Sequence, residues 1–217
     1  VPKRGAAQAL MKVMGVRNRL RKNKVSTATF LGDAIKAFDR IDREVVLRET
    51  EKRLKDRALA KRIRVRHGKM IARTVVEGEY LDMEVVTGVA QGDPNGPPTY
   101  VNGYGAVLQK IEDKRGENNA TEVVMTMPEW WEQTKEGGQA MEINVTKTMF
   151  VDDHLGVHKL RMGEGRKRWT VEVVRKQVKE IVWPIFEAQA EVGVESGAEK
   201  TVMIIELHGR GSQRVIK

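Results

Sequence analysis

The sequence predicts an α+β domain, in which helices pack on one face of an antiparallel sheet. Segments with the period of a strand alternate with segments with the period of a helix, in the order strand, helix, hairpin, helix, hairpin, helix, strand. The chain has 217 residues, of which 40% are hydrophobic and 32% charged. This is enough apolar side chain to bury a core for such a layered fold.

A basic amphipathic helix is predicted over residues 6–22, because apolar residues recur at helical spacing between arginines and lysines. These apolar positions are Leu10, Val13, Met14 and Leu20. Residues 25–31 then have the composition of a strand, and the chain becomes charged at Asp33. We therefore expect this strand to place Asp33 at the rim of the sheet.

A helix and a segment of less certain structure are expected next. Asp42 is of the residue type that caps helices, and it predicts a helix that runs to about residue 60. From residue 62 to residue 66, arginines alternate with aliphatic residues. If the segment is a strand, three guanidinium groups lie on one face, where they would bind nucleic acid. The alternative interpretation is that the segment is the solvated end of a helix. The three residues are Arg62, Arg64 and Arg66.

The middle of the chain predicts a hairpin, a helix and an insertion. Residues 71–76 and 79–86 flank Glu77-Gly78, which is typical of a β-hairpin. A helix is expected after a Pro-rich stretch, from apolar residues at helical spacing. These are Val101, Tyr104, Leu108 and Ile111. Residues 112–142 are polar and irregular, and we interpret them as an insertion.

The last part of the chain predicts two strands, a helix and a final strand. Residues 143–151 and 155–160 suit strands that join at Asp152-Asp153. Thr170 can cap the helix that follows. Residues 201–207 complete the sheet as its last strand.

Composition limits the classes of function. The net charge of +9 and the pI of about 9.7 predict a polyanionic partner, with nucleic acid favoured over an anionic membrane. The sequence has no apolar run of about 20 residues and no signal-peptide pattern, so we expect no membrane partner and an intracellular location, nuclear or cytoplasmic. Without cysteine, a disulfide framework, a zinc ribbon and a thiol nucleophile are excluded. No P-loop motif is present.

Two acidic clusters lie far apart in the sequence, Asp33 and the pair Asp152-Asp153. Each follows a strand-like run, which predicts carboxylates at the edge of the sheet. Carboxylates gathered from separate strands repel one another unless a cation holds them, and hard oxygen ligands suit Mg²⁺ or Mn²⁺. Two such ions can stabilise the attacking and leaving oxygens of a phosphoryl transfer. A lone Asp-Asp pair is more often a solvated turn, so a third motif is needed to decide.

Three motifs occur in a characteristic order. Residues 33–39 read D-A-I-K-A-F-D, residues 88–97 read G-V-A-Q-G-D-P-N-G-P, and residues 150–153 read F-V-D-D. Together they resemble motifs A, B and C of the reverse transcriptase family, and residues 36–39 look most like the non-LTR retrotransposon branch. The resemblance runs from about residue 25 to about residue 205. Within motif B, Ala90 and Asn95-Gly96 depart from the usual residues of the family.

This resemblance implies an organisation into parts of a polymerase. Residues 1–24 would be the C-terminal part of the fingers or a leading helix, and residues 25–217 the palm, interrupted by the insertion at about 112–142. The remaining fingers and the thumb are expected elsewhere on the same polypeptide. Because the first residue is Val1, we expect the chain to be a fragment or an internal domain.

The same resemblance implies an RNA-directed DNA polymerase of a retroelement, which uses two Mg²⁺ or Mn²⁺ ions. Its partners would be an RNA template, a DNA or RNA primer and deoxynucleoside triphosphates. Asp33, Asp152 and Asp153 would be the catalytic metal ligands, with Asp152 favoured within the pair. A decayed or recruited palm that serves as a nucleic-acid-binding scaffold is the alternative function, and an RNA-templated RNA polymerase is the third.

Substrate contacts are implied for five further residues. Phe38 would exclude the 2′-hydroxyl of a ribonucleotide, which distinguishes a DNA polymerase from an RNA polymerase; a core Phe beneath the sheet is the alternative. The loop of Gln91, Gly92 and Pro94 would pack on the template and the incoming base pair. Lys200 resembles the lysine of motif D, which would contact the triphosphate or its leaving group.

Overall fold

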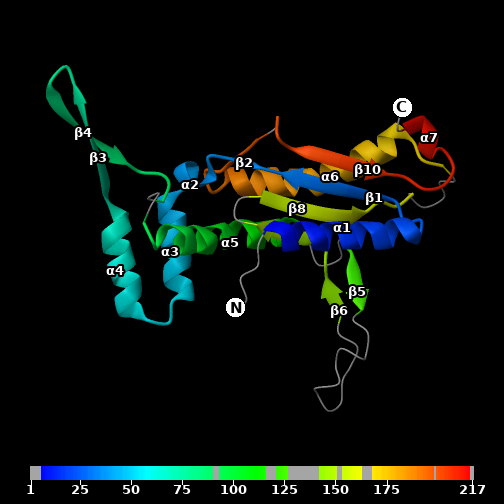
Figure 1. The fold of residues 1–217 in the computed structure, drawn as a ribbon, viewed down its shortest axis with the longest axis horizontal. Helices are drawn as coiled ribbons and strands as arrows, with labels where there is room; N and C mark the ends of the chain where they lie inside the picture. The colour runs from blue at the N-terminus through cyan, green and yellow to red at the C-terminus, as the bar shows by residue number, and fades with distance from the viewer. Residues whose placement is uncertain are drawn as a thin grey trace, which may run out of the picture. The chain divides into compact units, whose positions relative to one another are not determined.

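The α+β class is confirmed by the structure, a computed structural model with antiparallel sheets and helices (Figure 1). It describes residues 6–89, 93–115, 121–126, 142–150, 153–162, 168–197 and 199–215. In this described part of the chain, no helix is long and apolar enough to cross a membrane.

The chain forms two compact units. Unit 1 comprises residues 1–33, 118–183 and 198–217, and unit 2 comprises residues 34–117 and 184–197. These units group residues by proximity, so the assignment of parts of the chain to fingers and palm stays a prediction.

Unit 1 is built on a four-stranded antiparallel sheet with the order β10-β1-β8-β7. The strands are β1 (Thr27–Gly32), β7 (Lys147–Phe150), β8 (Asp153–Lys159) and β10 (Val202–Glu206). β1 pairs with β10 on one side and β8 on the other, so it is a central strand. The expected strands at residues 25–31, 155–160 and 201–207 are thus confirmed. A separate short pair joins β5 (Val124–Thr126) to β6 (Glu142–Asn144).

Helix α1 (Ala6–Lys22) confirms the leading helix, but its buried stripe differs from the predicted one. The buried residues are Val13, Val16 and Leu20, which pack with Val123 and Val157. Leu10 and Met14 were expected in this stripe, yet they are 49% and 53% exposed. A spacing of three and then four residues along a helix keeps Val13, Val16 and Leu20 on one face, which turns Leu10 and Met14 outward.

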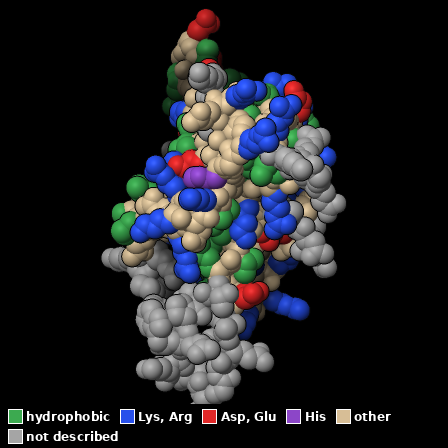
Figure 2. All heavy atoms as spheres, turned by 90° about the vertical axis from the view of Figure 1, so that its right-hand side faces the viewer, with side chains coloured by type: hydrophobic (Ala, Val, Ile, Leu, Met, Phe, Trp, Pro, Cys, Tyr) green, Lys and Arg blue, Asp and Glu red, His purple; other side chains and the backbone are tan. Residues whose placement is uncertain are grey.

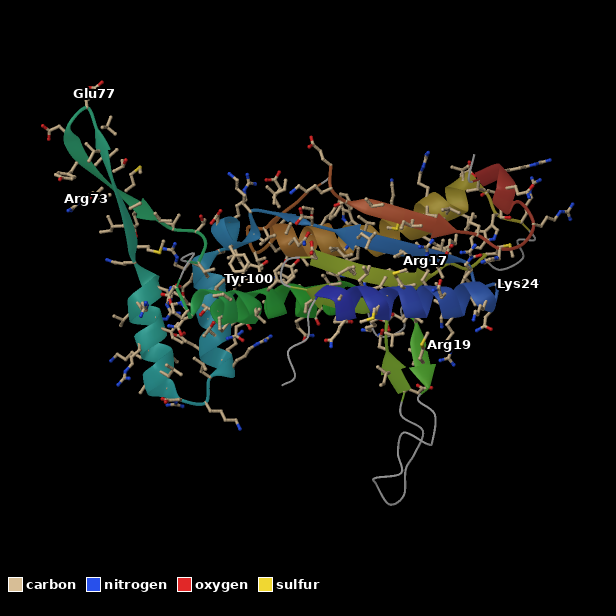
Figure 3. All side chains as sticks on the ribbon, in the orientation of Figure 1. Arg17, Arg19, Lys24, Arg73, Glu77 and Tyr100 are labelled. Atoms are coloured by element: carbon tan, nitrogen blue, oxygen red, sulfur yellow. The ribbon has the colours of Figure 1, made fainter. Side chains whose placement is uncertain are left out.

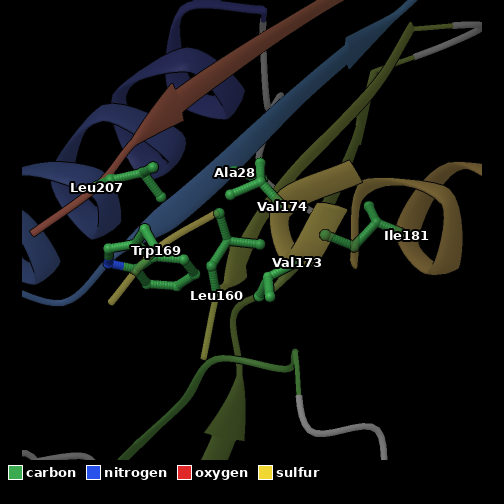
Figure 4. Packing of buried hydrophobic residues seen from close by; sticks show 7 residues of the cluster. All are labelled: Ala28, Leu160, Trp169, Val173, Val174, Ile181 and Leu207. Carbon is green, nitrogen blue, oxygen red and sulfur yellow. The ribbon is translucent and has the colours of Figure 1, made fainter. Parts of the chain in front are cut away.

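Helix α6 (Val171–Ala190) packs on the other face of the same sheet. Its Val173, Val174 and Ile181 join Ala28 of β1 in one core, together with Leu160, Trp169 and Leu207 (Figure 4). Ala28 and Thr29 point to opposite faces of β1, and Thr29 is paired with Val157 of the α1 core. α6 therefore supplies the expected helix layer on one face, and α1, from the segment 1–24, covers the other.

Unit 2 contains most of the remaining helices and the hairpin. Its elements are β2 (Ala34–Ile35), α2 (Ala37–Arg40), α3 (Arg43–Arg53), α4 (Arg57–Gly68), β3 (Met70–Val76), β4 (Glu79–Val85), α5 (Gly96–Arg115), the part of α6 from Pro184, and β9 (Glu195–Ser196). β2 pairs with β9, and α3 lies against α5 (Figure 1). The close approach of these helices depends on Gly103, where a Cβ would lie 2.5 Å from Cγ2 of Val46.

The predicted helix from residue 42 to about residue 60 forms as two helices. Asp42 caps α3 as expected, because its Oδ1 accepts hydrogen bonds from the N–H groups of Glu44 at 2.8 Å and Val45 at 3.3 Å. α3 ends at Arg53, and Asp56 caps α4 through the N–H groups of Ala58 and Leu59. The second Asp cap restarts the helix after a break of three residues.

The strand interpretation of residues 62–66 is wrong, since these residues lie inside α4. At helical spacing Arg62 and Arg66 share a face, whereas Arg64 lies on the opposite side. Arg64 bonds to Glu44 of α3, with Nη2 2.9 Å from Oε1, and also to Glu51. The three arginines therefore do not form one basic face, and Arg64 ties α4 to α3.

The hairpin of β3 and β4 confirms the prediction from Glu77-Gly78. Both turn residues have positive φ, 52° and 89°, as a two-residue type I′ turn requires (Figure 3). Across the strands, Arg73 pairs with Asp82 at 2.6 Å and lies 5.6 Å from the ring centroid of Tyr80.

Candidate active site

Asp33 and Asp153 are brought to the same edge of the sheet of unit 1 by the register of two neighbouring strands. Gly32, at the end of β1, pairs with His154, and Asp153 begins β8. Asp33 and Asp153 therefore take the next opposed positions, where Cα atoms of a continuing ladder are about 4.5–5.5 Å apart. Both residues line one open pocket of about 210 Å³. The expected approach of these two carboxyl groups thus has a structural basis.

Lys200 reaches this pocket from a third strand. It lies just before β10, whose Val202 pairs with Leu31 of β1. Its Nζ is 3.0 Å from Oδ2 of Asp33, with the lysine side chain 71% exposed and the aspartate side chain 28% exposed. An exposed ion pair of this kind is weak and exchanges readily, so Asp33 remains accessible to a cation or a substrate.

The donor set fits a hard divalent cation. Two carboxylates from adjacent strands meet in a pocket, and oxygen donors of this type suit Mg²⁺ or Mn²⁺. Among the described residues no cluster of three or more His, Asp or Glu side chains could hold a metal ion. Asp152 lies outside the described residues, so the expected set of three carboxylates and the ranking of Asp152 over Asp153 stay predictions.

The opposite face of this strand edge is closely packed. A Cβ at Gly32 would lie 2.5 Å from Cε1 of Phe30, so the ring of Phe30 lies against the end of its own strand. Phe30 is 1% exposed and meets His154 edge-to-face, with ring centroids 5.6 Å apart. Gly32, Phe30 and His154 thus form a rigid support beneath the backbone that carries Asp33 and Asp153. His154 and His158 are both fully buried on β8.

The second half of motif A lies in unit 2. Phe38 is half-buried and stacks on Tyr100 of α5, with centroids 4.1 Å apart and an interplanar angle of 19° (Tyr100 is labelled in Figure 3). Lys36, which precedes this helical turn, has a left-handed backbone with φ 46°. The ring of Phe38 is therefore fixed by a neighbouring aromatic residue rather than enclosed in a core.

The start of motif B is bound to motif A through the backbone. The N–H of Val89 donates to the carbonyl of Phe38, and the N–H of Gly88 donates to the carbonyl of Ile41, each at 2.8 Å. Arg43 is 4% exposed, and its guanidinium donates to the carbonyls of Val85, of Thr87 at 2.5 Å and of Gly88 at 2.9 Å. Burial lowers the pKa of Arg43, against the opposing charge of Glu84.

The end of motif B forms a turn just before helix α5. Oδ1 of Asp93 accepts a hydrogen bond from the N–H of Asn95 at 2.8 Å, and Oδ2 accepts one from Nε of Arg66 at 2.8 Å. The hydrogen bond from Asn95, followed by that from Arg66, lowers the pKa of Asp93. Asn95-Gly96, which departs from the family pattern, thus belongs to this turn. Pro94 is exposed beside it, and Gln91 and Gly92 lie outside the described residues.

Sequence patterns alone did not identify Gly88, Arg43 or Gly32 as important for this arrangement. Gly88 was noted only as part of motif B, and Arg43 was not singled out. The available signals were weak: a Gly in a strand or loop indicates close backbone approach, and a buried Arg needs several acceptors. For Gly88 and Arg43, the partners are also distant in the sequence.

The fold of this chain is similar to that of solved telomerase structures. Apo telomerase from Candida tropicalis, truncated from its C-terminal domain, is similar with a TM-score of 0.56 and 16% sequence identity, over 95% of this chain and 36% of that chain. Telomerase from Candida tropicalis in complex with the TWJ fragment of telomeric RNA is similar with a TM-score of 0.54 and 15% identity, over 94% of this chain and 30% of that chain.

At these identities the likeness establishes the fold alone. The chain spans about a third of the length of the telomerase chains that it resembles. No protein-family model matches the sequence, and no curated protein matches it either. The resemblance to reverse transcriptases seen in the motifs is thus supported at the level of the fold.

Proposed function

We propose that this chain is the palm of an RNA-directed DNA polymerase, encoded by a retroelement of the non-LTR type. The observation that supports this most is the pocket at the edge of the sheet, where Asp33, Asp153 and Lys200 arrive from three neighbouring strands. The telomerase-like fold supports the same conclusion independently, because it follows from the backbone rather than from the motifs.

The roles of the residues follow from their chemistry. Asp33 and Asp153, with Asp152, would hold two Mg²⁺ or Mn²⁺ ions. Bound there, these ions would neutralise phosphate charge and favour attack of a primer 3′-hydroxyl on the α-phosphate of a nucleotide. Lys200 would exchange its exposed ion pair with Asp33 for one to the triphosphate, since an exposed ion pair is weak and the triphosphate carries more negative charge.

Phe38 and motif B would orient the substrates. The stack on Tyr100 fixes the Phe38 ring, so that ring can exclude a 2′-hydroxyl by steric contact. Gln91, Gly92 and Pro94 would contact the template and the incoming base pair. The similar telomerase was solved with a fragment of telomeric RNA, which supports RNA as a partner of this chain. The motifs imply that this RNA would be a template, used with a DNA or RNA primer and deoxynucleotides.

The test is primer extension on an RNA template with Mg²⁺ or Mn²⁺, by the whole polypeptide that carries this domain. We expect Asp33→Asn, Asp152→Asn and Asp153→Asn each to lower the rate by at least roughly 100-fold, because a neutral amide is a poor ligand for a hard cation. Asp82→Asn is the matched control: it makes the same chemical change on the exposed hairpin and should leave extension unchanged.

The outcomes separate the proposed function from its alternatives. Extension that survives all three substitutions would reject the catalytic assignment. A protein that binds primed RNA but never extends it would favour the scaffold function. Efficient use of ribonucleotides in place of deoxynucleotides would favour an RNA polymerase.

A further inference from the structure

A second pocket lies at the other end of the sheet in unit 1. It measures about 400 Å³, and three arginines line it: Arg168, Arg210 and Arg214. The loop that carries Arg210 follows β10, whose Glu206 pairs with Thr27 at the start of β1, whereas Asp33 follows the end of β1. Six strand residues separate these ends by roughly 20 Å. The arginine pocket is therefore distinct from the carboxylate site.

The backbone around this pocket is fixed by hydrogen bonds. The N–H of Trp169 donates to the carbonyl of Arg210 at 2.9 Å, and the indole Nε1–H donates to the carbonyl of His208 at 2.8 Å. Gly211 has φ 88°, and a Cβ there would lie 2.7 Å from the carbonyl oxygen of Trp169. The side chains of Arg168 and Arg210 thus extend from two backbone segments that are hydrogen-bonded to each other. Arg214 belongs to α7 (Ser212–Val215).

The charge that the described residues bring to this pocket is of one sign. Among them, no residue that lines the pocket is acidic, and the three arginines are exposed. The nearby carboxylate of Glu206 is already bound by Arg17 at 2.9 Å, with Arg21 at 4.0 Å. Three guanidinium groups around one cavity repel one another, and an anion in the cavity would relieve that repulsion. Figure 2 shows this end of unit 1, where Lys and Arg side chains gather over much of the surface.

We propose that this pocket binds the backbone phosphates of a nucleic-acid strand, as a contact separate from the polymerase active site. The planar guanidinium fork of arginine matches the oxygens of a phosphate group and binds them in pairs. The net charge of +9 favours a polyanion over a small anion. Trp169 is 4% exposed and its indole N–H is already bonded, so no aromatic face in the lining stacks on a base. The pocket accordingly binds the backbone without recognising the sequence.

The experiment measures the salt dependence of binding to a labelled single-stranded 20-mer. The double variant Arg210→Gln/Arg214→Gln is compared with the unchanged chain between 50 and 300 mM salt. Each lost phosphate contact lowers the slope of log K against log salt by about 0.7 for single strands, so we expect a decrease of roughly 1.4. Arg19→Gln, an exposed arginine of α1 outside the pocket lining (labelled in Figure 3), should change the slope far less.

Two further measurements make the result specific. Modification of arginine by phenylglyoxal, mapped by mass spectrometry, should be suppressed at Arg168, Arg210 and Arg214 when the 20-mer is bound. Oligo(U) and oligo(A) should protect the three arginines from modification to the same extent, because the pocket contacts only the phosphates. Thermal unfolding of the double variant, compared with that of Arg19→Gln, checks that the substitutions leave the fold intact.

The proposal does not depend on catalysis, because no nucleotide or metal ion is present in these assays. The proposal would be overturned if the folded double variant had the same slope of log K against log salt as the unchanged chain. It would also be overturned if bound 20-mer did not protect the three arginines from phenylglyoxal. Equal protection by poly-glutamate would assign the pocket to an acidic peptide instead, and protection by inorganic phosphate with none by the 20-mer would assign it to a free anion.

Discussion

Gly88 occupies a position that only glycine fills without strain. Its φ is 77°, and a Cβ there would lie 2.7 Å from the carbonyl oxygen of Asp39. Gly88→Ala should lower the free energy of unfolding by about 1–3 kcal/mol, because the backbone must move away from motif A. Chemical denaturation followed by circular dichroism measures this change.

Gly15 is the control for Gly88, because an alanine there has room and should stabilise the fold. It lies in the middle of α1, and a Cβ there would meet no atom within 4 Å. Gly15→Ala should therefore raise the free energy of unfolding by about 0.5–1 kcal/mol, through helix propensity and a less flexible unfolded chain. Equal effects of the two substitutions would contradict the close contact between motifs A and B.

Phe38 tests whether a stacked ring also selects the sugar. Phe38→Val removes the contact with Tyr100, which should cost about 0.5–1.5 kcal/mol for an aromatic pair beyond the lost burial. We expect ribonucleotide incorporation to increase while deoxynucleotide use persists. The ratio of kcat/KM for the two substrates is measured beside the thermal stability, and a destabilised variant with unaltered discrimination would show that the ring is only structural.

Among single residues, the sequence predicts those with a distinctive functional group in a recognisable pattern more readily than those whose importance depends on tertiary contacts. Asp33 and Asp153 stand out because carboxylates at strand ends suggest a cation, and the structure does place them in one pocket. Arg43 carries no such signal, since its importance comes from carbonyl groups more than 40 residues away. Tertiary hydrogen bonds of that kind leave no periodicity to detect.

Among the elements, α5 and the C-terminal part of α6 are joined by a cluster of ion pairs. Glu191 pairs with Lys110 and with Lys114 at 2.8 Å, and Glu187 pairs with Lys114 at 3.3 Å. The hydrogen bond from Lys110, and then that from Lys114, lowers the pKa of Glu191 from 4.5 to about 2. The cluster therefore favours the ionised form of this carboxyl group in the folded chain.

This shift predicts how stability depends on pH. Because the pKa of Glu191 is lower in the folded chain than in the unfolded chain, its contribution is fully present above pH 4.5 and is lost as the pH falls from about 4.5 toward 2. Glu191→Gln should reduce the loss of stability over this range, as measured by urea unfolding from pH 2 to 7. Glu180→Gln, an exposed carboxylate outside the cluster, serves as the control. If the free energy of unfolding of Glu191→Gln fell more steeply with decreasing pH than that of the unchanged chain, the predicted direction of the effect would be wrong.

The elements show where periodicity is a sound guide and where it fails. Two strand-like runs that flank Glu77-Gly78 correctly predicted the hairpin, because Gly78 readily adopts the positive φ that a two-residue turn requires. Alternation at residues 62–66 was misleading, since five residues do not distinguish a strand from the exposed side of a helix. The cap at Asp56 was the stronger signal, and it starts α4.

For the molecule as a whole, charge and fold give different information. The net charge of +9 predicts binding to nucleic acid, but it does not say which arginines take part. The structure removes Arg64 from that role, because the hydrogen bonds that its guanidinium donates to Glu51 and Glu44 hold it in place and raise its pKa above the usual range. Arg66 is likewise bound to Asp93. Arg62 is exposed, on the same face of the helix as Arg66 and opposite Arg64.

Single substitutions in α4 therefore test how the charge of the whole chain is used. We expect Arg64→Gln to lower the melting temperature by a few degrees, since exposed ion pairs contribute under about 1 kcal/mol each, and to leave the salt dependence of nucleic-acid binding unchanged. Arg62→Gln should leave the melting temperature unchanged. If α4 lies along the nucleic acid, the same variant lowers the slope of log K against log salt by about 0.7–0.9. A changed slope in Arg64→Gln, with an unchanged melting temperature, would mean that its bonds to α3 open when nucleic acid binds.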